Sequence, residues 1–92
     1  MTPDLKPEGA MGKQAFEALE YLMNARNEED VLWGGQMVDA IIAHAAKMNS
    51  NDRLKLYKVL AYQAATATDQ NWLDMLRKKI LVRAYDRLSA FY

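Results

Sequence analysis

His44 is the only side chain in this sequence that conventionally exchanges a proton near neutral pH. The helical pattern around it places Asp39 on the opposite side of the helix, where it cannot orient the imidazole. The two serines do not pair with it either, because Ser50 stands in a helix cap and Ser89 stands near the end of the sequence. Without a nucleophile beside a base, we predict that the protein is not an enzyme.

Metal and cofactor sites are not predicted. A di-metal site in a helical bundle needs inward Glu residues and Glu-x-x-His pairs. This sequence has one His and no Cys, and Glu17 and Glu20 fall on the polar side of their helix. The pair Gly34-Gly35 lacks the further glycines and the lysine of a phosphate-binding loop.

Basic side chains give the alternative chemistry, which is phosphate binding. Arg77, Lys78, Lys79, Arg83 and Arg87 crowd one segment of the sequence. In the alternative reading, nucleic acid binds a basic face, with Trp72 and Tyr62 available to stack on bases. The residues of that face would be Lys55, Lys58, Lys79 and Arg83.

The charge distribution favours the simpler interpretation, an internally neutralised surface. Residues 1–30 carry three basic and seven acidic residues, a net charge of −4, whereas residues 31–92 carry nine basic and five acidic residues, a net charge of +4. The total is zero, unlike the clear basic excess of most nucleic-acid-binding domains. We expect Glu28, Glu29 and Asp30 to neutralise Arg77 and Lys78 across the bundle.

The composition predicts one cytoplasmic domain. The 92 residues are 51% hydrophobic, which suits a single folded core. No apolar run approaches the roughly 20 residues that span a bilayer. The first residues lack the basic start and apolar stretch of a signal peptide. Residues 1–12 hold both prolines and two of the four glycines, so we expect a flexible tail before a domain at residues 13–92.

Four segments have helical periodicity, separated by capping residues, and they predict an all-α fold. The expected helices span residues 13–25, 28–48, 52–65 and 71–92. Asn27 and Asp30 form a capping-box pattern, and Thr68 is the expected cap of the last helix. Short connections favour antiparallel neighbours, hence a small up-down four-helix bundle with a long C-terminal helix. The expected core is Leu19, Leu22, Val38, Ile41, Leu60, Leu76 and Ile80.

The pair Gly34-Gly35 lies inside the second predicted helix, where each glycine costs roughly 1 kcal/mol against alanine. Such a cost indicates a use. Close packing of a neighbouring backbone is the favoured interpretation, and a kink or break in the helix is the alternative.

The last helix carries two apolar faces, one more than a small core requires. Its second seam has heptad spacing and consists of Leu81, Tyr85, Leu88 and Tyr92. Either the chain itself covers this seam, or a partner does. We predict a homodimer through it.

Several large side chains lie off the expected inner faces, and aromatic residues and Met are enriched in interface cores. Trp33 and Met37 are the clearest examples outside the last helix. Together with the lack of a catalytic motif, they predict a non-enzymatic protein-binding module. It would be an adaptor, a complex subunit or a small phage-type inhibitor that blocks a larger protein.

Overall fold

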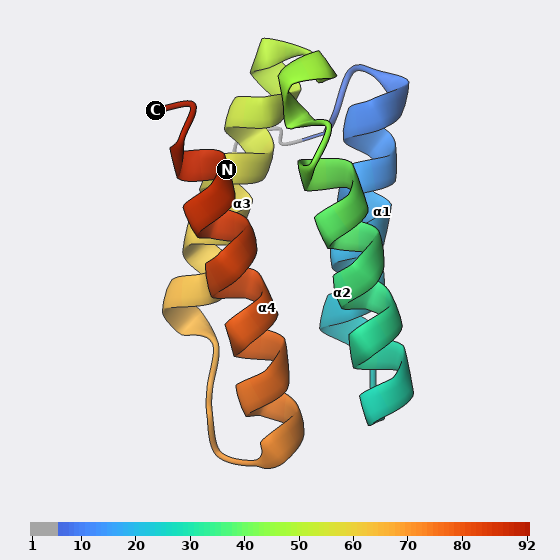
Figure 1. Ribbon diagram of the computed structural model, residues 1–92, viewed down its shortest axis with the longest axis vertical. Coiled ribbons are helices and arrows are strands. Elements are labelled where there is room, and N and C mark those ends of the chain that lie inside the picture. The colour runs from blue at the N-terminus through green and yellow to red at the C-terminus, as the bar shows by residue number, and fades with distance from the viewer. Residues whose placement is uncertain (1–5) are drawn as a thin grey trace.

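Four α-helices make up most of residues 6–92, which the computed structural model describes (Figure 1). Among these residues there is no strand. The predicted all-α helical bundle is therefore confirmed. The helices are α1 (Ala10–Asn24), α2 (Glu28–Ile42), the short 3-10 helix η1 (Ala45–Lys47), α3 (Ser50–Thr66) and α4 (Trp72–Ser89).

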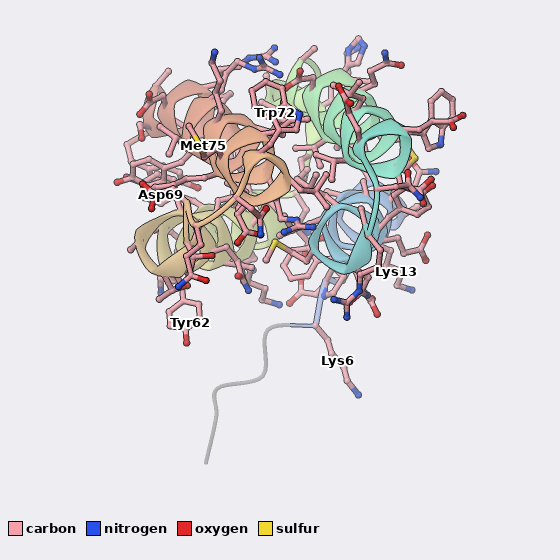
Figure 2. The ribbon with its side chains drawn as sticks, turned by 90° about the horizontal axis from the view of Figure 1, so that it is seen from below. Lys6, Lys13, Tyr62, Asp69, Trp72 and Met75 are labelled. Carbon is pink, nitrogen blue, oxygen red and sulfur yellow. The ribbon has the colours of Figure 1, made fainter. Side chains whose placement is uncertain are left out.

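The helices form two antiparallel hairpins that pack against each other. The first hairpin is α1 with α2, and the second is α3 with α4. Between the hairpins, α2 lies beside α4 and α1 lies beside α3, so the four helices stand at the corners of a square (Figure 2). Consecutive helices α2 and α3 occupy opposite corners, and the segment 43–49 with η1 crosses between them.

The core lies between the hairpins and closely follows the predicted set. Five of the seven expected residues are buried, and Ile41 and Leu76 are partly buried against them. The buried side chains include both small alanines and large leucines, and protein cores of such mixed sizes are closely packed. The side chains of the core that are fully buried or nearly so are Leu22, Val31, Ala45, Leu56, Leu60, Leu81, Ala84 and Leu88.

α1 begins at Ala10, three residues before the predicted start at Lys13. The reason is Asp52 of α3, whose carboxylate accepts hydrogen bonds from the backbone N–H groups of Glu8 and Gly9, each at 2.8 Å. A carboxylate from another helix thus caps α1 and complements its positive end. Residues 10–12 of the expected tail therefore belong to α1, and residues 1–5 lie outside the described residues.

The other end of α1 is held by a cation from the second hairpin. Arg77 of α4 donates hydrogen bonds to the carbonyl oxygens of Leu22 and Ala25. The Leu22 carbonyl also accepts the backbone N–H of Ala25, the C-cap of α1, at 3.4 Å. Arg77 also pairs with Asp74, at 3.2 Å. The acidic start of α2, which we expected to neutralise Arg77, is not its partner. The positive start of α1 is therefore bound by the negative charge of Asp52, and its negative end is bound by the positive charge of Arg77.

α2 ends at Ile42 instead of Met48, because the chain turns there into η1. Arg53 of α3 donates to the carbonyl oxygens of Ala45 and Met48, at 3.0 and 3.2 Å. The Ala45 carbonyl also accepts the N–H of Met48, at 3.0 Å, so Arg53 ties the turn that follows α2 to the start of α3.

α4 is also shorter than predicted, ending at Ser89 and not at Tyr92. At its start, Asn71 is the N-cap and accepts the N–H of Asp74, at 2.9 Å. Thr68, the expected cap, instead donates its hydroxyl hydrogen to the Asp74 carboxylate.

The two glycines of α2 allow close helix packing, as predicted, and the helix runs through them without interruption. A Cβ built on Gly34 would lie 2.9 Å from the Cα of Leu22 in α1. One built on Gly35 would lie 2.7 Å from the Cδ1 atom of Ile80 in α4. Gly34 therefore sets the spacing within the first hairpin, and Gly35 sets the contact with the second.

Candidate functional site

A shallow groove runs along the outer side of the first hairpin, between α1 and α2. One hollow of this groove has a volume of about 460 Å³. The close approach at Gly34 brings the helices together, while small side chains, Ala18 and Ala40, keep the floor of the hollow low. The hollow is lined by Gln14, Glu17, Ala18, Tyr21, Met37, Ala40 and Ile41.

Two adjoining hollows, of about 370 and about 400 Å³, extend this depression toward the start of α2. Tyr21 lines all three, so we call the whole surface the Tyr21 groove. Its further lining residues are Glu20, Asn24, Ala25, Glu29, Asp30, Leu32, Trp33 and Gln36.

The cap of α2 fixes the position of Tyr21. The Asn27 side chain accepts the backbone N–H of Asp30, at 2.8 Å, and donates to its carboxylate, at 3.1 Å. The predicted capping pattern is therefore confirmed. Asp30 in turn accepts the hydroxyl hydrogen of Tyr21, at 3.0 Å, and this bond to a carboxylate raises the pKa of Tyr21.

The Tyr21 groove is acidic along its rim. Four carboxylates line it, and its lining residues include no lysine or arginine. They come from the part of the sequence that carries the net charge of −4. An apolar floor bordered by one sign of charge favours a ligand of the opposite sign. The carboxylates are Glu17, Glu20, Glu29 and Asp30.

Trp33 and Met37, the predicted binding residues of α2, both line this groove. Trp33 is 55% exposed, and Met37 is partly buried against the core. Leu32 lies beside Trp33 and is also largely exposed. The structure therefore brings Trp33 and Met37 together with Tyr21, which was not among the residues predicted from the sequence.

The predicted seam of α4 is mainly covered by the chain itself. Leu81 and Leu88 are 0% exposed, so their side chains do not reach the surface. Tyr85 is partly buried, and its ring stacks on that of Tyr57 in α3, with 5.1 Å between the ring centroids. Tyr92 also stacks on Tyr57, at 4.6 Å, although it is 57% exposed. The seam thus closes the groove between α3 and α4.

The four predicted phosphate contacts do not form one face. Lys55 of α3 lies 3.6 Å from the Glu8 carboxylate and donates to the carbonyl oxygen of Lys6. Arg83 of α4 pairs with Asp39 of α2. Lys58 and Lys79 are exposed on α3 and α4. Two of the four are therefore already paired, one toward α1 and one toward α2.

The groups considered for catalysis stay apart. His44 is exposed in the turn after α2. Within residues 6–92, no three His, Asp or Glu side chains gather as ligands for a metal ion. Glu17 and Glu20 are exposed on α1 and line the Tyr21 groove.

Two sequence signals could have identified the Tyr21 groove. The first is the acidic excess of residues 1–30. The second is the position of Tyr21 and Ala18 at the edge of the apolar face of α1, next to its glutamates. The register between α1 and α2, which aligns Tyr21 with Met37, depends on the packing of Gly34 and is not visible in either helix alone.

Comparisons with protein families, with curated proteins and with solved structures found no match to this chain. None of the helices in the described part of the chain combines the length and the apolar composition that crossing a bilayer requires.

Proposed function

We propose that this protein is a non-enzymatic protein-binding module that engages its partner through the Tyr21 groove. The observation that carries the proposal is the open apolar floor around Tyr21, Trp33 and Met37, which the chain's own residues leave partly exposed. Exposed aromatic residues in a hollow are typical of interface hot spots. Adaptor, complex subunit and phage-type inhibitor are the roles that such a cytoplasmic module would have.

A protein partner suits the surface better than nucleic acid does. The groove carries carboxylates, which repel a phosphate backbone. Of the basic residues in the alternative interpretation, Lys55 and Arg83 are engaged in pairs within the chain.

The predicted homodimer stays a separate proposal. Leu81 and Leu88 lie in the core, which supports a contact with another protein on the first hairpin more than one on their seam. Light scattering at about 100 μM, where micromolar association is visible, tests self-association directly.

Two tryptophans of similar exposure provide a matched test of the binding surface. Trp33 lies in the groove and is 55% exposed. Trp72 lies at the start of α4 and is 63% exposed (Figure 2). In a pull-down from native lysate treated with nuclease, Trp33→Ala should lose the protein partner. Trp72→Ala should retain it.

Two results would contradict the proposal. One is loss of the partner in Trp72→Ala but not in Trp33→Ala. The other is recovery of nucleic acid alone, abolished when Lys79 and Arg83 are changed to Glu. Circular dichroism of each variant confirms that the helices are intact.

A further inference from the structure

The shape of the Tyr21 groove suits a helical ligand. It lies between two antiparallel helices and is lined from Gln14 to Asn24 along α1, about 15 Å at 1.5 Å per residue. The helices α1 and α2 use their backbone groups internally, so they offer no sheet edge to which a strand could add. A helix brings its own backbone already paired, and its side chains can enter the hollows beside Tyr21.

The floor and the rim specify which faces that helix must have. Ala18, Met37, Ala40 and Ile41 form an apolar floor, which requires apolar side chains on one face of the ligand. The surrounding carboxylates require positive charge beside that face. Glu17 and Glu20 have no hydrogen bond or ion pair within the described residues, so they are available to a ligand.

We infer that the Tyr21 groove binds a basic amphipathic helix of a partner protein. This inference rests on the proposed function and names the chemistry of the partner. A second copy of the same face is disfavoured because it would bring carboxylates against carboxylates. The same charge disfavours nucleic acid and anionic membranes.

Two peptides of about 18 residues, or five helical turns, are the probes. They share one leucine face and differ only in their polar face, which is lysine in one and glutamate in the other. The protein carries Trp72→Phe, so that Trp33 is its only tryptophan and its emission reports the groove. The lysine peptide should shift this emission to the blue and gain helicity by circular dichroism. The glutamate peptide should bind at least about tenfold more weakly.

Charge reversal in the groove has a matched control elsewhere. The variant with Glu17→Lys and Glu20→Lys should weaken the lysine peptide about tenfold. The control with Asp69→Lys and Asp86→Lys has the same net charge but changes exposed residues outside the groove, and should weaken it less than about twofold. Equal losses in both variants would show that only net charge attracts the peptide and would overturn the inference.

Three further results would overturn it. The first is equal affinity for both peptides, and the second is no change in Trp33 emission with either peptide up to about 1 mM. The third is a shift of Trp33 emission that depends on protein concentration without peptide, which would identify a second copy of the chain as the ligand. None of these decides the proposed function, because that depends on the pull-down with the Trp33 and Trp72 variants. A partner that is lost only in Trp33→Ala would then bind through another chemistry.

Discussion

Tyr21 and Tyr85 lie in the outer grooves of the two hairpins, but their surroundings differ. The ring of Tyr85 stacks on Tyr57, which also stacks on Tyr92. Tyr21 has no stacked ring among the described residues, and its hydroxyl bonds to Asp30. The second hairpin therefore fills its own groove with aromatic rings, while the first leaves its groove open between small side chains. Aromatic content alone therefore does not indicate an interface. An aromatic ring that stacks on another ring of the same chain is less available to a partner than one without such a neighbour.

The strongest test of this comparison places a charge in each groove. Leu88→Asp buries an unpaired carboxylate at a position with 0% exposure, so the free energy of unfolding should fall by about 4 kcal/mol or more. Trp33→Asp, on the exposed first hairpin, should cost less than about 1 kcal/mol. Urea denaturation followed by circular dichroism measures both.

The difference between the two grooves would be contradicted if the Leu88→Asp protein kept its free energy of unfolding but no longer formed an oligomer. That result would return the α4 seam to the role of a subunit contact, as the sequence predicted.

The next test concerns the spacing of the helices. Gly34→Ala should destabilise the protein by about 1–3 kcal/mol, because the new methyl group meets the backbone of Leu22. Gly35→Ala should cost less, because its closest contact is the Cδ1 end of the Ile80 side chain and not backbone. Both variants gain about 1 kcal/mol of helix propensity, so this gain does not affect their order. Thermal unfolding of the two variants gives the order, and the reverse order would show that Gly34 does not set the packing of the first hairpin.

The sequence predicted the helices and most of the core because both depend on local periodicity. Leu19, Leu22, Val38, Leu60 and Ile80 repeat at helical spacing and are buried as expected. Of the residues that line the Tyr21 groove, the sequence predicted only Trp33 and Met37 as binding residues.

Helix ends set by distant residues could not be predicted. α1 begins early because of Asp52, which is 43 residues from Gly9, and α2 ends early where Arg53 binds its following turn. The burial of Leu81 and Leu88 likewise depends on how the hairpins pack. The sequence of the last helix alone could not show whether the chain itself or a partner covers them.

The third test examines the clamp that holds α1 beside the groove. Burial opposes ionisation of Asp52, but the N–H groups of Glu8 and Gly9, with Lys55 and Lys13 nearby, hold its pKa below the usual value. The carboxylate therefore contributes stability above its unfolded pKa of about 3.9, and this contribution is lost as pH falls through the lower folded pKa.

Asp52→Ala should accordingly cost about 1–3 kcal/mol at pH 7, because two backbone N–H groups lose their acceptor. The difference in the free energy of unfolding between Asp52→Ala and the unchanged protein should become smaller as pH falls below about 4. Urea titrations at several pH values measure it. A difference that does not depend on pH would mean that the carboxylate charge does not hold α1.

The smallest expected effect concerns the hydroxyl of Tyr21. Its bond to Asp30 raises its pKa, since ionisation would lose that bond and place two negative charges together. The neutral phenol thus contributes stability below the ordinary pKa of about 10, which is lost as pH rises through the raised folded pKa.

Asp30→Asn should lower the pKa of Tyr21 toward the ordinary value, and Asp86→Asn, outside the groove, should leave it unchanged. Following the Tyr21 ring signals by NMR from neutral to alkaline pH measures both, and an equal pKa in the two variants would show that Asp30 does not set the state of the groove.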